Sequence, residues 1–283
     1  MSLLDRVRAC HGWDPEAYRP FLVAGRPVGR VRHEFTERLA DFGRTFAVEN
    51  GAVSLDPALG SFEERSAALA EVLARLRAEG GVPGWRGEPY PVVRSWGETP
   101  LMQIERAAVP LFGVRGFGVH LNGFVETPNG LEMWIGKRAM SKPTGPGKLD
   151  HLAAGGQPHG LGIRENMIKE CQEEAGMAPK LAARVVPVGT VSYRCARREG
   201  LRDDVLFCFD LEVPPDFEPR NTDGEVEAFY RWPIARVIET LKEGDAFKFN
   251  VALVIIDFLV RRGLLDPDDP DYSAIVEGLR LGR

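Results

Sequence analysis

Apolar and polar residues alternate along the first hundred positions with two different periods. A period of two places alternate side chains on one face of a strand, and a period of three to four places them on one face of a helix. Short strands are predicted at residues 21–24, 28–31 and in a hairpin over 46–55, and helices at 3–10, 34–42 and 62–78. These short, mixed elements predict a small α+β unit.

Turn and cap residues support these boundaries. Asn50 and Gly51 stand between two short apolar runs, which is the composition of a tight hairpin turn. Ser61 stands three residues before Glu64, which predicts a capping box at the start of the longest helix of this unit. Residues 81–100 are rich in glycine and proline and predict a loop-rich boundary.

The second unit is richer in strand patterns. Strands are predicted at 112–125, 131–138, 185–193, 204–211 and 227–232, and helices at 234–242 and 247–262. One glutamate-rich helix lies between the second and the third of these strands. We therefore predict an N-terminal α+β domain at 1–105, a second domain at 106–265 and a C-terminal extension at 266–283.

The glutamate-rich helix lies within residues 155–177, which read GGQPHGLGIRENMIKECQEEAGM. Glu170, Glu173 and Glu174 fall on one edge of that helix. The apolar face beside them is formed by Ile163, Met167, Cys171 and Ala175. Carboxylates this close repel one another and weaken a helix, unless cations neutralise them. Hard divalent cations prefer carboxylate oxygens, so the spacing indicates a metal-binding edge.

This segment resembles the Nudix box, the signature of the Nudix hydrolases, whose pattern is G-x5-E-x7-REUxEExGU with U an aliphatic residue. Gly155 takes the first position, and the run KECQEEAGM takes the end. Leu161 replaces the early Glu of the pattern, and Lys169 replaces the Arg. In the family those two side chains form a salt bridge that braces the loop on the helix, so that brace is absent here. Glu165 and Arg164 are the candidates to replace it.

Longer phrases narrow the resemblance to one branch of the family. The runs FGVHLNGF, MWIGKR, KPTGPGKLDHLAAGGQPHG and NMIKECQEEAG resemble a branch that joins a Nudix domain to an N-terminal domain of unassigned role. This branch includes the Nudix portion attached to fungal thiamine pyrophosphokinase and the related plant enzymes. The resemblance implies an α/β/α sandwich with a mixed sheet, and activity on thiamine diphosphate and its oxidised analogues. Nothing in composition or spacing shows thiamine.

The resemblance also implies a metal site. Glu170, Glu173 and Glu174, together with a backbone carbonyl at Gly155, would hold Mg²⁺ or Mn²⁺. Glu173 and Glu174 are then catalytic carboxylates as well as metal ligands.

A further residue must orient or deprotonate the attacking water, and in the family it often lies beyond the box. The candidates are Asp223, Glu225 and Glu227 in the run NTDGEVEAFYRW. Glu225 and Glu227 are favoured because they precede a strand that can pass the helix. The candidate substrate contacts are Lys148, Arg138 and Gln157.

Composition restricts the class of protein and its possible partners. The 283 residues are 44% hydrophobic and 27% charged, which is typical of a globular protein, and the net charge of −5 disfavours a nucleic-acid partner. No apolar run reaches membrane-spanning length, and residues 1–15 lack the apolar core of a signal peptide. The four cysteines show no CxxC pairing, so reduced thiols in a cytoplasmic protein are expected. A homodimer is left open.

Three functions are compatible with these features. The favoured one is Mg²⁺-dependent hydrolysis of thiamine diphosphate or its oxidised analogues to the monophosphate and phosphate. Hydrolysis of nucleotides, such as oxidised nucleoside triphosphates or ADP-ribose, is the second, and the N-terminal domain and the branch phrases disfavour it. A non-catalytic diphosphate-binding module is the third. The changes at Leu161 and Lys169 support it, but all three metal-binding carboxylates are retained.

Overall fold

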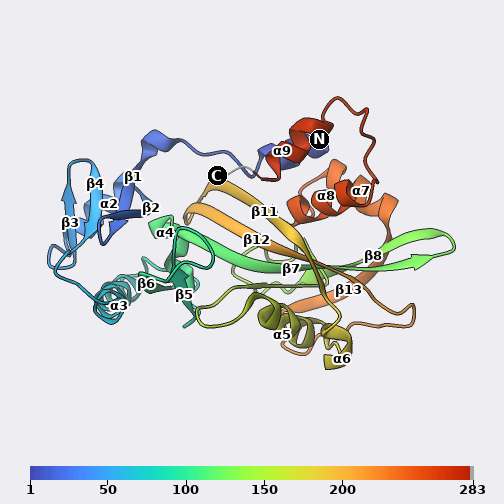
Figure 1. Ribbon diagram of the computed structural model, residues 1–283, viewed down its shortest axis with the longest axis horizontal. Coiled ribbons are helices and arrows are strands. Elements are labelled where there is room, and N and C mark those ends of the chain that lie inside the picture. The colour runs from blue at the N-terminus through green and yellow to red at the C-terminus, as the bar shows by residue number, and fades with distance from the viewer. Residues whose placement is uncertain (281–283) are drawn as a thin grey trace.

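The computed structural model describes residues 1–280 as a small N-terminal unit beside a larger unit built on one long sheet (Figure 1). The strands are β1 (Tyr18–Val23), β2 (Arg26–Arg32), β3 (Phe46–Glu49), β4 (Ala52–Leu55), β5 (Pro89–Val92), β6 (Met102–Glu105), β7 (Arg115–Thr127), β8 (Gly130–Arg138), β9 (Leu149–Asp150), β10 (Ala153–Gly156), β11 (Val186–Arg197), β12 (Gly200–Glu212) and β13 (Val226–Pro233). The helices are α1 (Leu3–Arg8), α2 (His33–Ala40), α3 (Phe62–Ala78), α4 (Val109–Phe112), α5 (Ile163–Ala175), α6 (Pro179–Ala182), α7 (Ile234–Glu243), α8 (Val251–Arg261) and α9 (Tyr272–Gly278). Two short 3-10 turns are η1 (Pro15–Ala17) and η2 (Arg106–Ala108).

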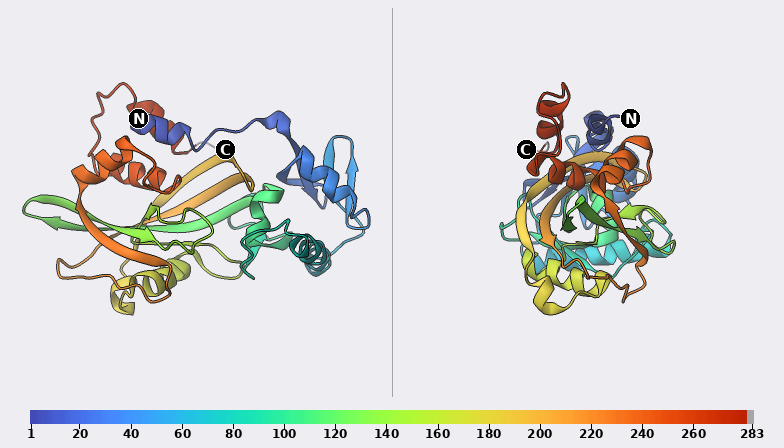
Figure 2. Two further views of the ribbon diagram at one scale, coloured as in Figure 1. Left: turned by 180° about the vertical axis from the view of Figure 1, so that it is seen from behind. Right: turned by 90° about the vertical axis from the view of Figure 1, so that its right-hand side faces the viewer.

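The larger unit is a mixed sheet between two helical layers. The order of its main strands is β11-β12-β7-β8-β13, and β10 and β9 pair with β7 and β8. β7 is parallel to β12 but antiparallel to β8 and β10. α5 and α6 cover one face of the sheet, and α7 and α8 cover the other (Figures 1 and 2). The predicted α+β class and the α/β/α sandwich are therefore confirmed.

One helix fills most of the core on the second face. Every residue of α8 from Val251 to Leu259 is buried. The sequence predicts this helix from residue 247, but Phe247 forms a bridge to Leu149 and Asn250 caps the helix, so α8 begins four residues later.

The small unit contains a second sheet with the order β2-β1-β4-β3, together with α2, α3 and the pair β5–β6. Phe21, Phe46 and Phe112 stack in its core, with ring centroids 5.0 to 6.3 Å apart. Asn50 and Gly51 adopt φ values of 51° and 76° and form the predicted turn between β3 and β4. Such a turn places both central residues in the left-handed region, where Asn and Gly are the best tolerated residues.

The sequence prediction of α3 is correct. The helix spans the predicted residues, and the predicted capping box is formed, with the backbone N–H of Glu64 donating to the Ser61 hydroxyl oxygen at 3.1 Å.

Further segments differ from the sequence prediction. Residues 81–100, predicted as a loop, contain β5, which pairs with β6. Phe112, predicted in a strand, ends α4, because Gly113 adopts a φ of 53° and turns the chain before β7. α9 was not predicted. It follows an acidic turn, and its residue Ile275 is buried in the core of the larger unit.

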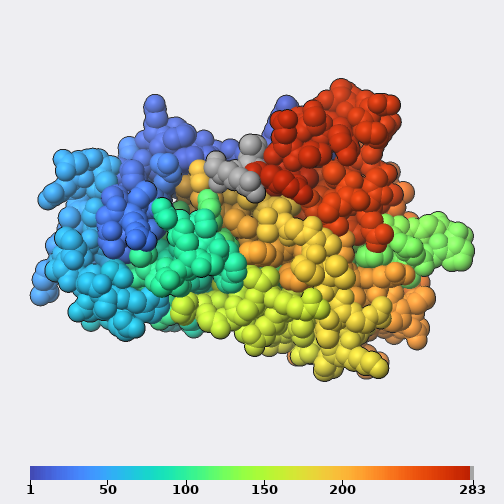
Figure 3. Space-filling view, in the orientation of Figure 1, coloured from blue at the N-terminus to red at the C-terminus, as the bar shows by residue number. Residues whose placement is uncertain are grey.

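The chain passes between the units more than once. α1 packs against α8 and α9, so Leu4 and Val7 belong to the core of the larger unit (Figures 1 and 2). Phe112 and Val114, in contrast, are part of the core of the small unit. The limits at residues 105 and 265 stay a prediction. The two units form one continuous surface (Figure 3). Within residues 1–280, no helix has both the length and the hydropathy needed to cross a membrane.

Candidate functional site

α5 carries the three glutamates and is held in place by its apolar face. Met167, Cys171 and Ala175 are fully buried in one core cluster with Val119 and Leu121 of β7. Burial raises the pKa of the Cys171 thiol to about 12, which fits a packing residue rather than a nucleophile. The glutamates lie on the remaining edge of the helix.

The three glutamates differ in exposure. The side chain of Glu173 is 48% exposed and that of Glu170 is 14% exposed, whereas Glu174 is buried. The Glu174 carboxylate accepts a 2.7 Å hydrogen bond from the backbone N–H of Ala154, so it is held between α5 and β10. Gly155 follows in β10, and a Cβ atom at this position would overlap the Glu170 carboxyl group. The glycine therefore lets the strand lie directly against the carboxylate edge of α5.

The charges on this edge are incompletely neutralised. Burial raises the pKa of Glu170; Glu173 and Glu225 raise it further, while Lys169 opposes them. Burial also raises the pKa of Glu174 well above its usual range. Lys169 forms ion pairs with Glu173 and, at 3.5 Å, with Glu170. An all-oxygen donor set with too little positive charge fits a hard divalent cation such as Mg²⁺ or Mn²⁺.

Amide side chains brace the segment before α5. Nδ2 of Asn166 donates to the backbone oxygen of Gly156 at 2.8 Å and to Oε1 of Gln157 at 3.0 Å. Nε2 of Gln157 in turn donates to the backbone oxygen of Leu161 at 2.6 Å. Both amide residues are 0% exposed. They form the brace that the changed box positions do not provide.

The two substitutes suggested from the sequence have other contacts. Glu165 accepts a hydrogen bond from the backbone N–H of Gly162 at 3.4 Å, and Arg164 donates to the backbone oxygen of Ala183 at 2.7 Å. The sequence reasoning missed the amide pair because nothing in the box pattern refers to those two positions.

A loop after β12 brings a further carboxylate to the site. The Thr222 hydroxyl donates to the backbone oxygen of Glu173. The backbone N–H of Arg220 donates to the backbone oxygen of Ala175 at 2.9 Å. These contacts tie the loop to the C-terminal end of α5. Glu225 follows in the same loop and lines the cavity described below.

Glu225 and Glu227, the two favoured candidates for orienting water, lie in different places. Glu225 forms an ion pair with Lys142 and lines the cavity together with Asp223. Burial raises the pKa of Glu225, but the pairing with Lys142 outweighs it, and the pKa is below its ordinary value. Glu227, at an irregularity in the β13–β8 register, pairs with Lys137 at 2.8 Å and lies outside the cavity. The geometry therefore favours Glu225.

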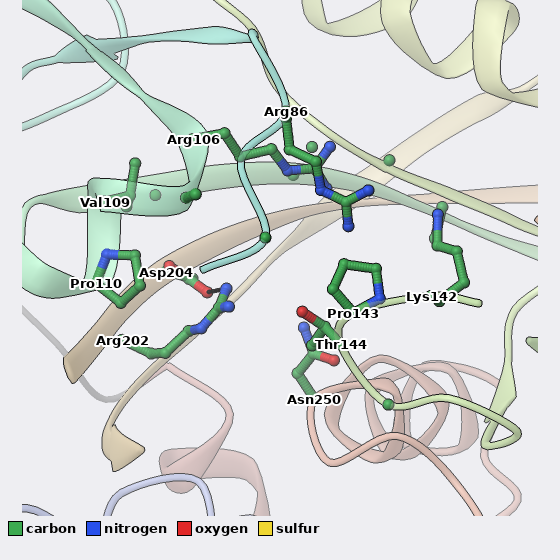
Figure 4. Close-up of a pocket in the computed structure, with 18 of the residues that line it drawn as sticks. Arg86, Arg106, Val109, Pro110, Lys142, Pro143, Thr144, Arg202, Asp204 and Asn250 are labelled. Carbon is green, nitrogen blue, oxygen red and sulfur yellow. Dashed lines mark ion pairs between the residues drawn. The ribbon is translucent and has the colours of Figure 1, made fainter. Parts of the chain in front are cut away.

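Glu170, Glu173 and Glu225 line a cavity of about 1150 Å³ between the two units. Figure 4 shows other residues of its lining, among them Arg86, Arg106 and Lys142. Its cationic lining residues are Arg86, Arg106, Arg138, Lys142, Lys169, Arg197, Arg198, Arg202 and Lys248. Its apolar lining residues include Val109, Pro110, Leu111, Phe117, Leu206 and Phe249. One cavity thus combines carboxylates suited to a cation with cations suited to a polyanion.

The three predicted substrate contacts are separated in the structure. Arg138 lines the cavity, but it also donates to Asp150 at 2.6 Å. Lys148 pairs with Asp245 at 2.7 Å and lies at a different surface hollow. Gln157 is internal, in the amide brace. The cavity cations of the small unit were missed, because no sequence motif marks them.

A buried polar cluster lies next to the cavity. Nδ1 of His120 and Nδ1 of His151 are 3.1 Å apart, and Asp150 is 3.6 Å from His151. Asp150 also pairs with Arg138 and, at 3.7 Å, with Lys248. Burial lowers the pKa of Lys248 to about 8 and that of His120 well below its usual value. The two cations beside Asp150 oppose a metal ion here, so we interpret the cluster as a network that joins β7 to β9.

Comparisons with known proteins fit this combination of units. Residues 2–116 match a family model described as "Domain of unknown function (DUF4743)". DR0079 from Deinococcus radiodurans, a solved structure, gives a TM-score of 0.45 at 21% identity over 62% of this chain and 98% of that one. Uncharacterized protein YJR142W of Saccharomyces cerevisiae is 30% identical over 254 residues, or 83% of this chain and 73% of the relative. Nudix hydrolase 24, chloroplastic, of Arabidopsis thaliana is 46% identical over 265 residues, or 93% of this chain and 73% of the relative. With that identity over most of both sequences, the chain belongs to the Nudix hydrolase family.

Proposed function

We propose that this Nudix hydrolase cleaves a diphosphate with the help of Mg²⁺ or Mn²⁺. The observation that carries the proposal is the shared cavity, which is lined by Glu170, Glu173 and Glu225 and also by Arg86 and Arg106. A diphosphate repels an attacking water because its oxygens are negatively charged. Carboxylates that hold a metal ion, together with cations that bind the oxygens, remove that repulsion.

The metal ion would be held by Glu170, Glu173 and Glu174, with the backbone oxygen of Gly155 as a further candidate. When bound, the ion would neutralise phosphate oxygens and polarise a water molecule. Burial disfavours the ionised form of Glu174, and a cation beside it would favour that form again.

We assign the orientation of the attacking water to Glu225. Its pKa is lowered, so it is ionised near neutral pH, and Lys142 fixes its carboxylate in the cavity wall. Its side chain lines the same cavity as Glu170. A water held by Glu225 would form the new P–O bond as the bridging P–O bond breaks, and its proton would pass to the carboxylate.

The substrate we propose is thiamine diphosphate or an oxidised analogue, cleaved to the monophosphate and phosphate. The branch phrases of the sequence support this choice. A cavity of about 1150 Å³ exceeds what a diphosphate alone requires, and Phe117 and Phe249 among its lining residues suit a heteroaromatic ring. A nucleoside triphosphate or ADP-ribose is the alternative substrate. The cytoplasmic location and the homodimer stay predictions from the sequence.

The test is phosphate release with Mg²⁺ or Mn²⁺ across a panel of thiamine diphosphate, its oxidised analogues, ADP-ribose and oxidised nucleoside triphosphates. Glu170→Gln removes one metal-binding charge and is expected to lower kcat by roughly 100-fold or more. Glu71→Gln is the matched control, because Glu71 is exposed on α3 and outside the cavity.

The proposal would be supported in full if the unaltered protein prefers the thiamine compounds, if Glu170→Gln loses this turnover and if Glu71→Gln retains it. Turnover of nucleotides alone would retain the hydrolase and overturn the thiamine assignment. No turnover of any compound with either metal would overturn hydrolysis in favour of a diphosphate-binding module.

A further inference from the structure

The small N-terminal unit directly contacts the glycine loop, residues 155–160 before α5. The backbone N–H of His159 donates to the backbone oxygen of Pro89 in β5 at 2.8 Å. A Cβ atom on Gly156 would overlap the Tyr90 hydroxyl and the Arg106 guanidinium, so both side chains lie against the backbone of the glycine loop. Glycine is the residue that permits so close an approach. The two units are therefore in direct contact beside the carboxylate edge of α5.

One buried carboxylate organises the part of this unit that faces the cavity. Glu105 is 9% exposed and accepts hydrogen bonds from the backbone N–H groups of Arg86, at 2.8 Å, and Glu88, at 3.1 Å. The backbone N–H of Arg106, the next residue, donates to the backbone oxygen of Glu88 at 2.9 Å. These bonds fix the segment that carries Arg86 beside the segment that carries Arg106.

Both arginines project into the cavity from the same side, facing Lys142 (Figure 4). The Arg106 side chain is 39% exposed although it lies between the two units, and it pairs with Glu88 at 2.8 Å. Arg86 is exposed, and in the part of the chain that the structure describes its guanidinium forms no ion pair. Glu88 pairs with Arg106, and the Glu105 carboxylate accepts from backbone N–H groups, so the Arg86 guanidinium presents its positive charge to the cavity.

Three carboxylates, those of Glu170, Glu173 and Glu225, line the same cavity as the two arginines. Among the described residues, however, neither arginine comes within ion-pair distance of these carboxylates. The charges therefore act across the cavity, and the space between them is free for a ligand.

We propose that Arg86 and Arg106 of the N-terminal unit bind the diphosphate oxygens that face away from the metal-binding helix. The site is then composite: α5 and its loops hold the metal side, and the N-terminal unit holds the other side. Guanidinium groups suit this role, since their paired N–H donors match phosphate oxygens. This inference rests on the proposed function, because it takes a diphosphate as the ligand.

Binding is measured by calorimetry with methylenediphosphonate and Mg²⁺, a probe that cannot be hydrolysed. Arg86→Ala and Arg106→Ala are each expected to weaken its Kd by roughly 10- to 100-fold, the effect of losing charge-assisted hydrogen bonds. The KM for the best panel substrate should rise by a similar factor. Arg26→Ala, at an exposed end of β2, is the control and should change neither value by more than about twofold.

Arg86→Ala is the decisive variant, because Arg106 also holds Glu88 and its loss could disturb the local fold. Unchanged binding in Arg86→Ala, or no binding by the unaltered protein, would overturn the inference. Arginine-dependent binding without turnover of any panel compound would retain the subsite and overturn the proposed hydrolysis. Turnover that is indifferent to both arginines would retain hydrolysis and overturn the subsite.

Discussion

Asn166→Ala removes the amide that braces the glycine loop before α5. Its Nδ2 group donates two hydrogen bonds, to Gly156 and Gln157, in a fully buried position. Leaving two acceptors without a donor costs about 1–3 kcal/mol each. The Oδ1 atom of Asn166 is itself buried without a partner, so its removal offsets about 1 kcal/mol. The net loss of stability is therefore expected to be about 1–5 kcal/mol.

The measurement is urea unfolding followed by tryptophan fluorescence, together with the turnover of the best panel substrate. With an m value of about 3 kcal/mol/M, the midpoint should fall by about 0.3–1.7 M. Turnover should fall by at least about tenfold under native conditions, because Gly155 and Gly156 lose their fixed position. Asn129→Ala, in the exposed turn between β7 and β8, is the control and should change stability by less than about 0.5 kcal/mol. An Asn166→Ala protein with the midpoint and turnover of the unaltered chain would refute the amide brace.

Two further predictions concern the buried network and the contact between the units. Asp150→Asn leaves two cations beside an uncharged group and should cost about 3–5 kcal/mol at pH 7, whereas Asp245→Asn, at an exposed ion pair, should cost little. Burial raises the pKa of Asp150, but the neighbouring cations lower it well below the ordinary value. The stabilisation by the Asp150 carboxylate is therefore present above about pH 4 and is lost as the pH falls through its lower folded pKa. The unfolding midpoints of the unaltered protein and Asp150→Asn should converge in acid, and midpoints that stay apart would contradict this. Gly156→Ala would place a methyl group against Tyr90 and Arg106, so the Kd for methylenediphosphonate should increase by about tenfold or more. Unaltered binding would show that the two units do not pack closely at Gly156.

The composite cavity gives the N-terminal unit a physical role. A cavity lined by both units requires them to keep a fixed relation, and contacts at Gly156 and His159 provide it. α1 adds a second connection, because it packs with α8 and α9 on the far side of the larger unit.

Features that depend on neighbours in the sequence were determined by the sequence alone. The capping box at Ser61, the turn at Asn50 and Gly51, and the buried face of α5 each follow from residues no more than four positions apart. Hydrogen bonds of that range form wherever the local conformation forms, so pattern and spacing suffice to predict them. The carboxylate edge with Glu170 and Glu173 belongs to this class.

The tertiary structure decided which distant groups share the cavity. Spacing could not separate Glu225 from Glu227. Glu227 lies at an irregularity in the β13–β8 register and pairs with Lys137, whereas Glu225 precedes β13 and pairs with Lys142. Nor could spacing identify Arg86, whose position depends on how β5, β6 and the glycine loop meet. Such contacts depend on which faces of separate elements pack together, and that is set by burial over the whole chain rather than by any local pattern.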